Sequence, residues 1–218
     1  MMQTLALFDE PEVSREPKQI VDGAMLLLGF ALGLDCELIT AVERIITAAP
    51  FRHLQTPGGL TMSVAMSNCG AYGWVSDRRG YRYEACDPLS GQPWPEMPAS
   101  FATLAGAAAA AAGFDDFAPD ACLINRYLPG AKMSLHQDRD ERDFAEPIVS
   151  VSLGLPAVFQ FGGLSRKDVV QRVPLMHGDV VVWGGAARLR FHGVLTLKAG
   201  QHTLLGERRI NLTFRRAR

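Results

Sequence analysis

The sequence contains few cysteines and has no excess of charge of either sign. Its four cysteines, Cys36, Cys69, Cys86 and Cys122, are widely separated among 218 residues and form no Cys-x-x-Cys pair. This spacing is not that of a disulfide framework and predicts reduced, mostly buried thiols. The formal net charge of −1 gives none of the basic excess by which a protein holds nucleic acid through phosphate neutralisation alone. Any contact with nucleic acid must therefore be local.

Long uninterrupted apolar runs are also absent. Three stretches without Asp, Glu, Lys or Arg reach bilayer-spanning length, but each is broken by Pro and Gly or consists largely of alanine: His53–Ser76, Met97–Phe114 and Pro147–Ser165. The N-terminus has no basic stretch that leads into an apolar run, so we expect no secretory signal, no membrane partner and a cytoplasmic location. The length and the 48% hydrophobic content fit one large domain.

The chain divides into a polar arm and a patterned domain. Residues 1–18 show no sustained period, which predicts a flexible arm, and residues 19–218 are expected to form the single domain. Two helices are predicted, one where apolar residues at helical spacing follow an N-cap-like Asp35, and one in an alanine-rich stretch before Gly113. From Ala121 onward, short strands are separated by Gly-containing turns, which favours a β-sandwich or barrel.

A group of metal-binding residue types lies in the second half of the chain. His136 and Asp138 are two residues apart, and on an extended strand or at its end this spacing places both side chains on one face. His192 follows a break at Gly184–Gly185. Two imidazoles and one carboxylate on a β scaffold form the facial triad of non-haem iron, which leaves open positions for the substrates of the metal. By itself the His-x-Asp tripeptide is weak, because a lone histidine is more often a core or surface residue.

The last predicted strand, residues 209–215, alternates strictly between polar odd positions and apolar even positions. Taken alone, this alternation favours an amphipathic strand with its polar face in water. Beside a metal that binds a dicarboxylate, a second interpretation applies. Such a co-substrate chelates iron through its keto acid end and needs a planar cation for its far carboxylate, a task that suits arginine. Arg209 or Arg215 could supply this cation.

Five motifs extend over most of the domain. They are Thr56-Pro57-Gly58-Gly59, Asn125-Arg126-Tyr127, Pro129-Gly130-Ala131-Lys132, His136-Gln137-Asp138-Arg139-Asp140 and Arg209-Ile210-Asn211-Leu212-Thr213-Phe214-Arg215. Together these motifs resemble those of the AlkB family of alkylation-repair dioxygenases. The resemblance implies an α+β fold with a double-stranded β-helix (jelly-roll) core, N-terminal helices and a nucleotide-recognition lid over residues 51–96. It also implies Fe(II), 2-oxoglutarate and O2 as cofactors.

The resemblance assigns roles to residues at matching positions. His136, Asp138 and His192 would bind iron, and no catalytic side chain is implied beyond these ligands. The residues that would line the 2-oxoglutarate pocket are Asn125, Tyr127, Arg209, Asn211 and Arg215. Without the resemblance, Asn125 and Tyr127 are simply alternate residues on one face of a strand, and such residues are more often structural than ligand-binding.

In family members a methylated base is flipped out and stacked. Trp74, Tyr81 and His136 fall at positions that resemble those around this base, with Asp140 and Arg166 as further substrate-binding candidates. Bases such as 1-methyladenine and 3-methylcytosine are cationic, so an aromatic face attracts them, and extrusion is cheapest from single strands. An isolated aromatic is, however, more often core packing, and Asp140 between charged neighbours could equally be an exposed turn residue.

The implied reaction is oxidative demethylation, which converts 2-oxoglutarate to succinate and CO2 and releases formaldehyde and the unmodified base. The implied partner is alkylated DNA, single-stranded, with RNA as an alternative and with no obligate protein partner. Two other functions stay open: a 2-oxoglutarate-dependent hydroxylase of a protein or small molecule, and a non-catalytic metal-binding barrel. Asp77, Ile210 and Arg190 depart from the family pattern, and these departures bear on substrate preference rather than on the metal.

Overall fold

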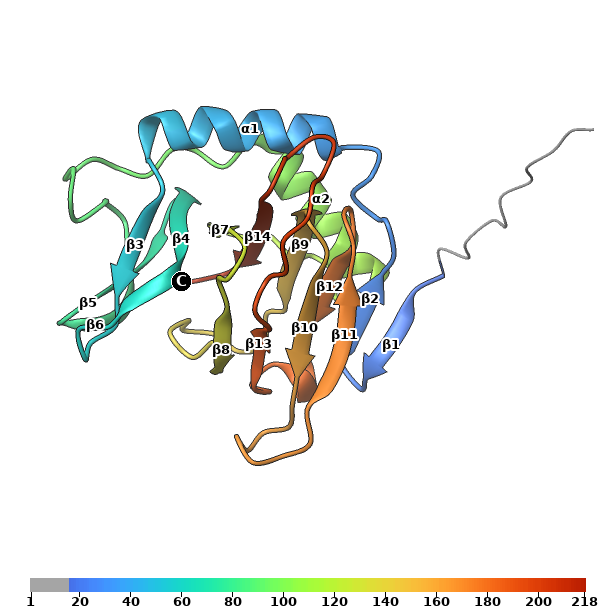
Figure 1. Cartoon of the computed structure of the whole chain (residues 1–218). Coiled ribbons are helices and arrows are strands. Elements are labelled where there is room, and N and C mark those ends of the chain that lie inside the picture. The colour runs from blue at the N-terminus through green and yellow to red at the C-terminus, as the bar shows by residue number, and fades with distance from the viewer. Residues whose placement is uncertain (1–15) are drawn as a thin grey trace, which may run out of the picture.

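The computed structural model describes residues 16–218, which fold around two facing antiparallel β-sheets (Figure 1). The major sheet contains, in spatial order, β1 (Lys18–Val21), β2 (Ala24–Leu27), β12 (Val180–Trp183), β9 (Ile148–Gly154), β14 (Arg209–Arg215), β7 (Ala121–Tyr127), β4 (Thr61–Gly70) and β3 (Arg52–Gln55). The minor sheet contains β11 (Gln171–Leu175), β10 (Ala157–Phe161), β13 (His192–Val194) and β8 (Met133–His136). Successive strands from β7 to β10, and again from β11 to β14, alternate between the sheets. This winding is that of a jelly roll, as the sequence predicts.

Apolar side chains fill the space between the sheets and also cover the outer face of the major sheet. Between the sheets, Phe159 of β10 packs with Tyr127 and Trp183 of the major sheet. On the outer face, Leu212 and Phe214 of β14 pack beneath the helices. β14 is buried along its whole length. Its polar face therefore points into the interior between the sheets, and the interpretation that this face lies in water is wrong.

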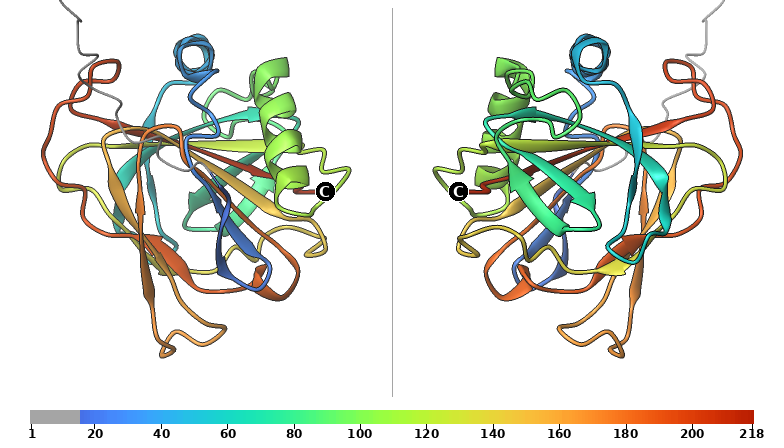
Figure 2. Two further views of the ribbon diagram at one scale, coloured as in Figure 1. Left: turned by 90° about the vertical axis from the view of Figure 1, so that its right-hand side faces the viewer. Right: turned by 90° about the vertical axis from the view of Figure 1, so that its left-hand side faces the viewer.

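Two helices pack on the major sheet. α1 (Asp35–Ala48) runs along one end of the sheet and α2 (Ala99–Ala111) lies against its outer face (Figures 1 and 2). Leu34 occupies the N-cap position of α1, so Asp35 is the first helical residue rather than the cap. Its carboxylate accepts a 2.7 Å hydrogen bond from the next backbone N–H, near the positive end of the helix dipole. α2 ends before Gly113, whose φ of 86° suits a glycine. A short 3-10 helix, η1 (Gly185–Ala187), follows β12.

A separate hairpin stands beside the two sheets. β5 (Gly73–Asp77) and β6 (Gly80–Glu84) pair with each other and with no strand of the larger sheets in the described chain. The hairpin lies to one side of the barrel, next to β3 and β4 (Figures 1 and 2). The side chain of Asn68 on β4 holds it there, because it bonds both the N–H and the carbonyl of Trp74 at 3.0 Å.

Two of the departures from the family pattern have structural explanations. The Asp77 carboxylate forms an ion pair with Arg82 on the same hairpin, with Nη2 of Arg82 2.9 Å from Oδ2 of Asp77. Its negative charge is therefore compensated within the hairpin. Ile210 is 2% exposed and lies among the residues that pack beneath the helices, so its apolar side chain extends the core face of β14.

Several expectations concern residues outside the sheets. All four cysteines are free thiols; Cys69 and Cys122 are buried, but Cys36 and Cys86 are exposed, so the prediction of burial is wrong for these two. The predicted arm, residues 1–18, falls mostly outside the described residues, and Lys18 already belongs to β1. Within residues 16–218, no helix has the length and apolar character needed to cross a membrane.

Candidate functional site

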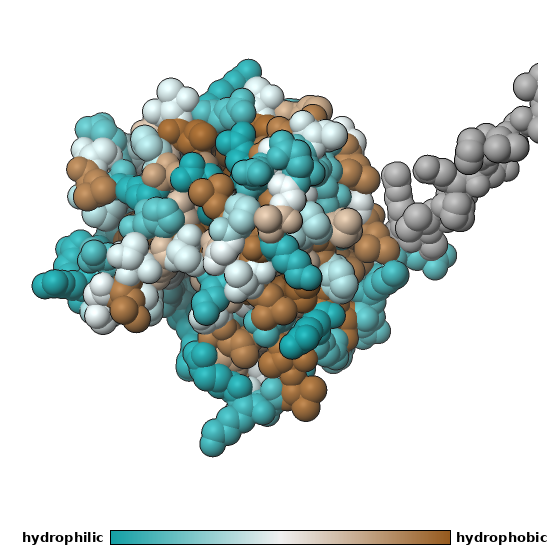
Figure 3. All heavy atoms as spheres, in the orientation of Figure 1, coloured by the Kyte–Doolittle hydropathy of each residue, from teal (hydrophilic) through white to brown (hydrophobic). Residues whose placement is uncertain are grey.

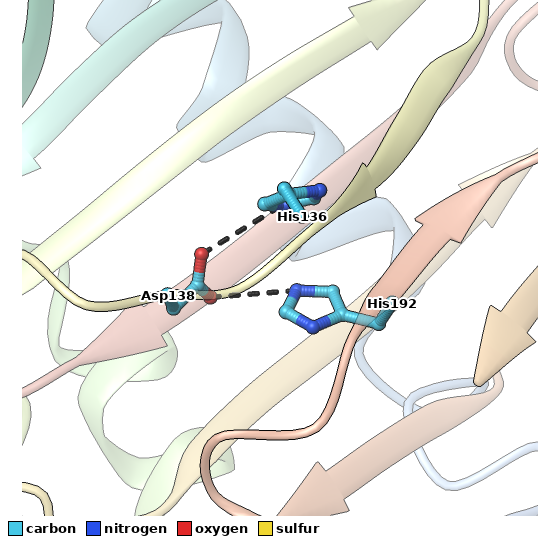
Figure 4. A group of neighbouring side chains, drawn as sticks. All are labelled: His136, Asp138 and His192. Carbon is cyan, nitrogen blue, oxygen red and sulfur yellow. Dashed lines mark ion pairs between the residues drawn. The ribbon is translucent and has the colours of Figure 1, made fainter. Parts of the chain in front are cut away.

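Three side chains of metal-binding types, His136, Asp138 and His192, meet in the interior between the sheets (Figure 4). His136 is the last residue of β8, Asp138 follows just beyond it, and His192 opens β13. The two histidines are direct cross-strand partners, so the pairing of β8 with β13 sets their separation. Oδ1 of Asp138 lies 3.6 Å from Nε2 of His136, and Oδ2 lies 3.6 Å from Nε2 of His192. One potential ligand atom from each residue can be chosen so that all three lie within 4.8 Å of one another. This donor set fits a divalent iron ion.

Hydrogen bonds orient both imidazoles toward the common point. Nδ1 of His136 lies 2.9 Å from the carbonyl oxygen of Ser134, and Nδ1 of His192 lies 3.0 Å from the carbonyl oxygen of Arg190. A carbonyl can only accept, so each Nδ1 carries the proton and each Nε2 keeps its lone pair for a metal. Burial and the neighbouring His192 lower the pKa of His136 to about 4, so this ring is neutral at pH 7, as a metal ligand must be.

Two arginines hold Asp138, the third candidate ligand, in place. Arg215 donates to Oδ2 of Asp138 from Nη2 at 2.7 Å and from Nε at 3.1 Å, and Arg188 donates to the Asp138 backbone carbonyl at 3.0 Å. Burial alone would raise the pKa of Asp138, but the positive charge of Arg215 outweighs it and holds this pKa well below its usual range. The carboxylate is therefore ionised and fixed by protein groups.

A buried arginine, Arg209, belongs to the same face of β14 as Arg215. Arg209 is 1% exposed, its Nη2 donates to the hydroxyl of Ser152 at 2.9 Å, and its guanidinium carbon lies 5.0 Å from the centre of the Tyr127 ring. Nε and Nη1 of Arg209 have no hydrogen-bond partner in residues 16–218. Buried donors without partners are costly unless a ligand supplies acceptors. The free N–H groups fit a carboxylate, which is the group that 2-oxoglutarate presents.

The predicted co-substrate residues share one cross-strand ladder. Tyr127 of β7 pairs with Arg209 of β14, and Asn125 pairs with Asn211. Nδ2 of Asn125 donates to Oδ1 of Asn211 at 3.2 Å, whereas Oδ1 of Asn125 is buried without a partner in the described chain. Arg215 lies at the far end of β14, beside the carboxylate of Asp138. The five residues therefore lie between the sheets, from the buried arginine to the candidate metal ligands.

The predicted substrate residues fall into two places. The rings of Trp74 and Tyr81 are stacked with centroids 5.6 Å apart, and Nε1 of Trp74 donates to Oδ2 of Asp140 at 2.7 Å. Burial raises the pKa of Asp140, and Tyr81 is 46% exposed. Arg166 lies apart from this group, on the β10–β11 loop, which projects from the lower edge of the barrel with hydrophilic and hydrophobic surface side by side (Figure 3). Its guanidinium stacks on Phe191 at 5.0 Å, next to a predicted iron ligand.

Four residues around the candidate site are absent from the sequence prediction. Ser152 contacts the buried arginine, the Trp183 ring centre lies 4.9 Å from that of His192, and Glu141 and Arg188 form a 3.1 Å ion pair beside Asp138. Ser152 carries a signal, because β9 has serines at alternate positions within an apolar run. The other three carry none, since an isolated tryptophan or charged residue has many structural roles.

Two sequence comparisons, one with a family profile and one with individual proteins, both relate the chain to 2-oxoglutarate-dependent oxygenases. The profile of the 2OG-Fe(II) oxygenase superfamily matches residues 24–215. The chain is 56% identical over 213 residues to the alpha-ketoglutarate-dependent dioxygenase AlkB of Salmonella typhimurium and to that of Escherichia coli, with 98% of each chain covered. It is 47% identical over 182 residues to the AlkB homolog of Caulobacter vibrioides, covering 83% of this chain and 81% of the relative.

Comparison with solved structures points to the same fold. The structure of OsALKBH1 superposes with a TM-score of 0.82 at 28% identity, and the match covers 92% of this chain and 100% of that protein. More distant relatives at the sequence level include the nucleic acid dioxygenase ALKBH1 of Homo sapiens, which is 31% identical over 56% of this chain. The chain spans 31% of the length of that human protein, whereas it spans nearly all of the bacterial relatives.

Proposed function

We propose, because the chain belongs to the AlkB family within the 2OG-Fe(II) oxygenase superfamily, that it removes N-alkyl groups from nucleic-acid bases by oxidation. It is an Fe(II)- and 2-oxoglutarate-dependent dioxygenase that uses O2. The bases we propose as substrates are 1-methyladenine and 3-methylcytosine. The observation that carries this function is a His-Asp-His cluster together with a buried arginine that has unpaired donors, both between the two sheets.

The proposed reaction hydroxylates the methyl group and then breaks its bond to nitrogen. Iron, 2-oxoglutarate and O2, when bound, supply the oxidation, which protein side chains cannot perform. One atom of O2 ends in succinate and the other in formaldehyde, while 2-oxoglutarate loses CO2. The N-hydroxymethyl group of the cationic base loses its hydroxyl proton as the carbon–nitrogen bond breaks, so the electron pair returns to the ring nitrogen. We assign no separate general base.

The residues between the sheets orient the two ligands that this reaction needs. His136, Asp138 and His192 would hold iron through two Nε2 atoms and one carboxylate. Arg209 would bind the far carboxylate of 2-oxoglutarate, because its Nε and Nη1 are buried donors that lack acceptors. Arg215 would meet the keto acid end, since it already lies against Asp138.

The remaining co-substrate residues would shape the pocket between these ends. The unpaired Oδ1 of Asn125 is a buried acceptor that faces the same interior as Asn211, to which its amide is bonded. The ring of Tyr127 lies under the Arg209 guanidinium and limits how this cation can turn. A fixed guanidinium binds a carboxylate with less loss of conformational freedom than a mobile one does.

The base would be held at the hairpin β5–β6, which belongs to the proposed lid over residues 51–96. The exposed Tyr81 and the partly buried Trp74 offer aromatic faces to a cationic base. Asp140 is fixed by its 2.7 Å bond from Trp74 and adds a carboxylate beside this surface. Arg166, on the opposite β10–β11 loop, would contact the surroundings of the base or its backbone.

The proposed partner is single-stranded DNA in the cytoplasm, with RNA as a second substrate class. A net charge of −1 restricts phosphate contacts to local arginines. Few phosphate contacts leave little binding free energy to offset the cost of opening a duplex, so a single strand is favoured. No obligate protein partner is proposed, and residues 19–218 are proposed to act as one domain.

Mass spectrometry of a single-stranded DNA oligomer that carries 1-methyladenine tests this function. The oligomer is incubated aerobically with Fe(II), ascorbate, 2-oxoglutarate and the protein. We expect loss of one methyl group with release of succinate and formaldehyde. His136→Ala should abolish the reaction. The control His202→Ala should not, because His202 lies in the loop after β13, where its ring packs against that of His177 and is not part of the predicted metal site.

Trp74→Ala separates base repair from other oxygenase functions. Loss of the stacking face should lower the repair rate by about tenfold or more, since stacking contributes about 1–3 kcal/mol per base. Binding of Fe(II) and 2-oxoglutarate should stay unchanged. Undiminished repair would refute the stacking role, and succinate release by the wild type without demethylation would point to a protein or small-molecule substrate.

A further inference from the structure

Glu141 is a buried carboxylate that is bonded to three side chains from different parts of the molecule. It accepts a 2.6 Å hydrogen bond from the hydroxyl of Tyr83, a 3.1 Å contact from Nη2 of Arg188 and a 3.3 Å contact from Nε of Arg215. Glu141 is only 6% exposed, and Arg188 is only 2% exposed. Two buried cations thus share one carboxylate. Its removal would leave Arg188 without a neutralising carboxylate and Arg215 with that of Asp138 alone.

Each partner of Glu141 touches a different functional element. Tyr83 lies on β6 and is the direct cross-strand partner of Trp74, and Tyr81 is two residues before it on the same strand. A shift of the base-binding hairpin therefore moves the Tyr83 hydroxyl. On the other side, Arg215 bonds the carboxylate of Asp138 and Arg188 bonds its backbone carbonyl.

The contacts that run from Tyr83 through Glu141 and Arg215 to Asp138 are called the relay here. Its hydrogen bonds are made to charged groups in a desolvated interior. Burial raises the pKa of Tyr83 well above its usual value, so its hydroxyl keeps the proton and can donate it to Glu141. Charge-assisted hydrogen bonds of this kind are shorter and stronger than neutral ones. The chain of contacts from Tyr83 through Glu141 and Arg215 to the metal-ligand carboxylate is consequently stiff.

We propose that Glu141 is a positioning residue that couples the base-binding hairpin to the iron ligand Asp138, so that a bound base promotes 2-oxoglutarate turnover. This coupling rests on the proposed function, because it takes Trp74 and Tyr81 as the base-binding surface. A base held against these rings fixes the hairpin and, through Tyr83, the carboxylate of Glu141. Arg215 then holds Asp138 in one orientation, and oxidation of 2-oxoglutarate takes place when the methyl group is present.

Tyr83→Phe tests this coupling because it removes one hydroxyl and keeps the ring. The matched control is Tyr72→Phe. Tyr72 packs in the same small cluster, and the guanidinium of Arg218 lies 5.9 Å from both tyrosine rings. The Tyr72 hydroxyl has no side-chain hydrogen bond to residues 16–218, so its loss leaves the relay intact.

The measurement is the ratio of succinate formed to methyl groups removed, together with the stimulation of succinate formation by methylated oligomer. In unproductive turnover ascorbate supplies the two electrons that the base otherwise provides. We expect Tyr83→Phe to lower the stimulation and raise the ratio by about fivefold, the range in which residues between two sites alter their coupling. The dissociation constants of Fe(II) and 2-oxoglutarate should change less than twofold, and Tyr72→Phe should match the wild type.

Glu141→Gln gives a second variant that keeps the shape and removes the charge. It should uncouple turnover more than Tyr83→Phe does, and a thermal melt establishes that the folded protein is being measured. The coupling is overturned if Tyr83→Phe repairs with the ratio and stimulation of the wild type, or if it loses repair and succinate formation in parallel, as a purely structural defect would cause. A wild type that leaves the base methylated would instead refute the proposed function, and the coupling with it.

Discussion

Arg209 combines complete burial with unpaired hydrogen-bond donors. Lysine in its place keeps the positive charge but cannot present two N–H groups in one plane to a carboxylate. We therefore expect Arg209→Lys to weaken 2-oxoglutarate binding by about tenfold or more, which corresponds to about 1.4 kcal/mol. Isothermal titration under anaerobic conditions with Fe(II) measures this change.

Arg208→Lys is the matched control for this substitution. Arg208 precedes Arg209 in the chain, is only partly buried, and bonds the carbonyl of Leu205 through Nε at 3.1 Å. Its replacement should leave 2-oxoglutarate binding unchanged. Equal affinities of the wild type and Arg209→Lys would contradict the assignment of this arginine to the far carboxylate.

At the residue scale, the sequence predicts which types of residue form the site better than it predicts which groups each of them contacts. Alternation in residues 209–215 identifies a polar face, but it cannot say whether that face meets water or the interior, because burial depends on the opposite sheet. Glu141 shows the limit most clearly. It stands between Asp140 and Arg142 in a run of charged residues, where a solvated turn is the ordinary expectation, yet the fold buries it between two arginines.

At the element scale, β13 is a strand of three residues that places His192 opposite His136. Gly193 at its centre lies very close to β8, because a Cβ there would lie 2.6 Å from the carbonyl oxygen of Met133. Gly193→Ala should therefore push the two strands apart and weaken Fe(II) binding by about tenfold or more, since misplaced ligands lose metal affinity. Anaerobic titration with Fe(II) measures the effect.

The control for this change is Gly33→Ala, where a Cβ meets no atom within 4 Å. Its iron affinity should equal that of the wild type. If Gly193→Ala also binds iron normally, the close approach of β8 and β13 is not what sets the ligand separation.

The sequence predicts helices more reliably than it predicts which strands pair, because helix formation depends on neighbouring residues and strand pairing does not. The alanine-rich stretch has high helix propensity along its whole length, and the structure contains α2 there. The start of α1 is less certain from sequence, since Asp35 resembles a cap but is the first helical residue. The pairing of β8 with β13 has no local signal, because the partners are far apart in the chain and meet only through the winding of the barrel.

At the scale of the whole molecule, the protein has one core between the sheets and another between the major sheet and the helices. Phe101 of α2 belongs to the second core, is fully buried, and meets Phe214 edge to face at 5.7 Å. Phe101→Ala should cost about 3–5 kcal/mol of unfolding free energy. The melting temperature should then fall by roughly 6–20 °C for a chain of this size.

Thermal melts of the apoprotein measure this loss, with the exposed Thr103→Ala on the same helix as the control. Below its melting temperature, Phe101→Ala should bind 2-oxoglutarate as the wild type does, because the candidate site lies on the opposite face of β14. A large fall in affinity without a fall in melting temperature would mean that the helix core acts on the site rather than on the scaffold.

The hairpin β5–β6 shares no strand-to-strand hydrogen bonds with the two large sheets in the described chain. His136, His192 and the buried Arg209, in contrast, lie on strands of the two large sheets, where a slip of one residue in the register would turn their side chains to the other face. If the hairpin holds the base as proposed, we expect substitutions on it to alter which base is accepted and to leave the His-Asp-His cluster in place, apart from changes to the hydrogen bond of Tyr83. The fold thus places proposed substrate specificity on the β5–β6 hairpin, which can change in sequence, and the candidate metal and co-substrate residues in and beside the paired strands, which tolerate little change.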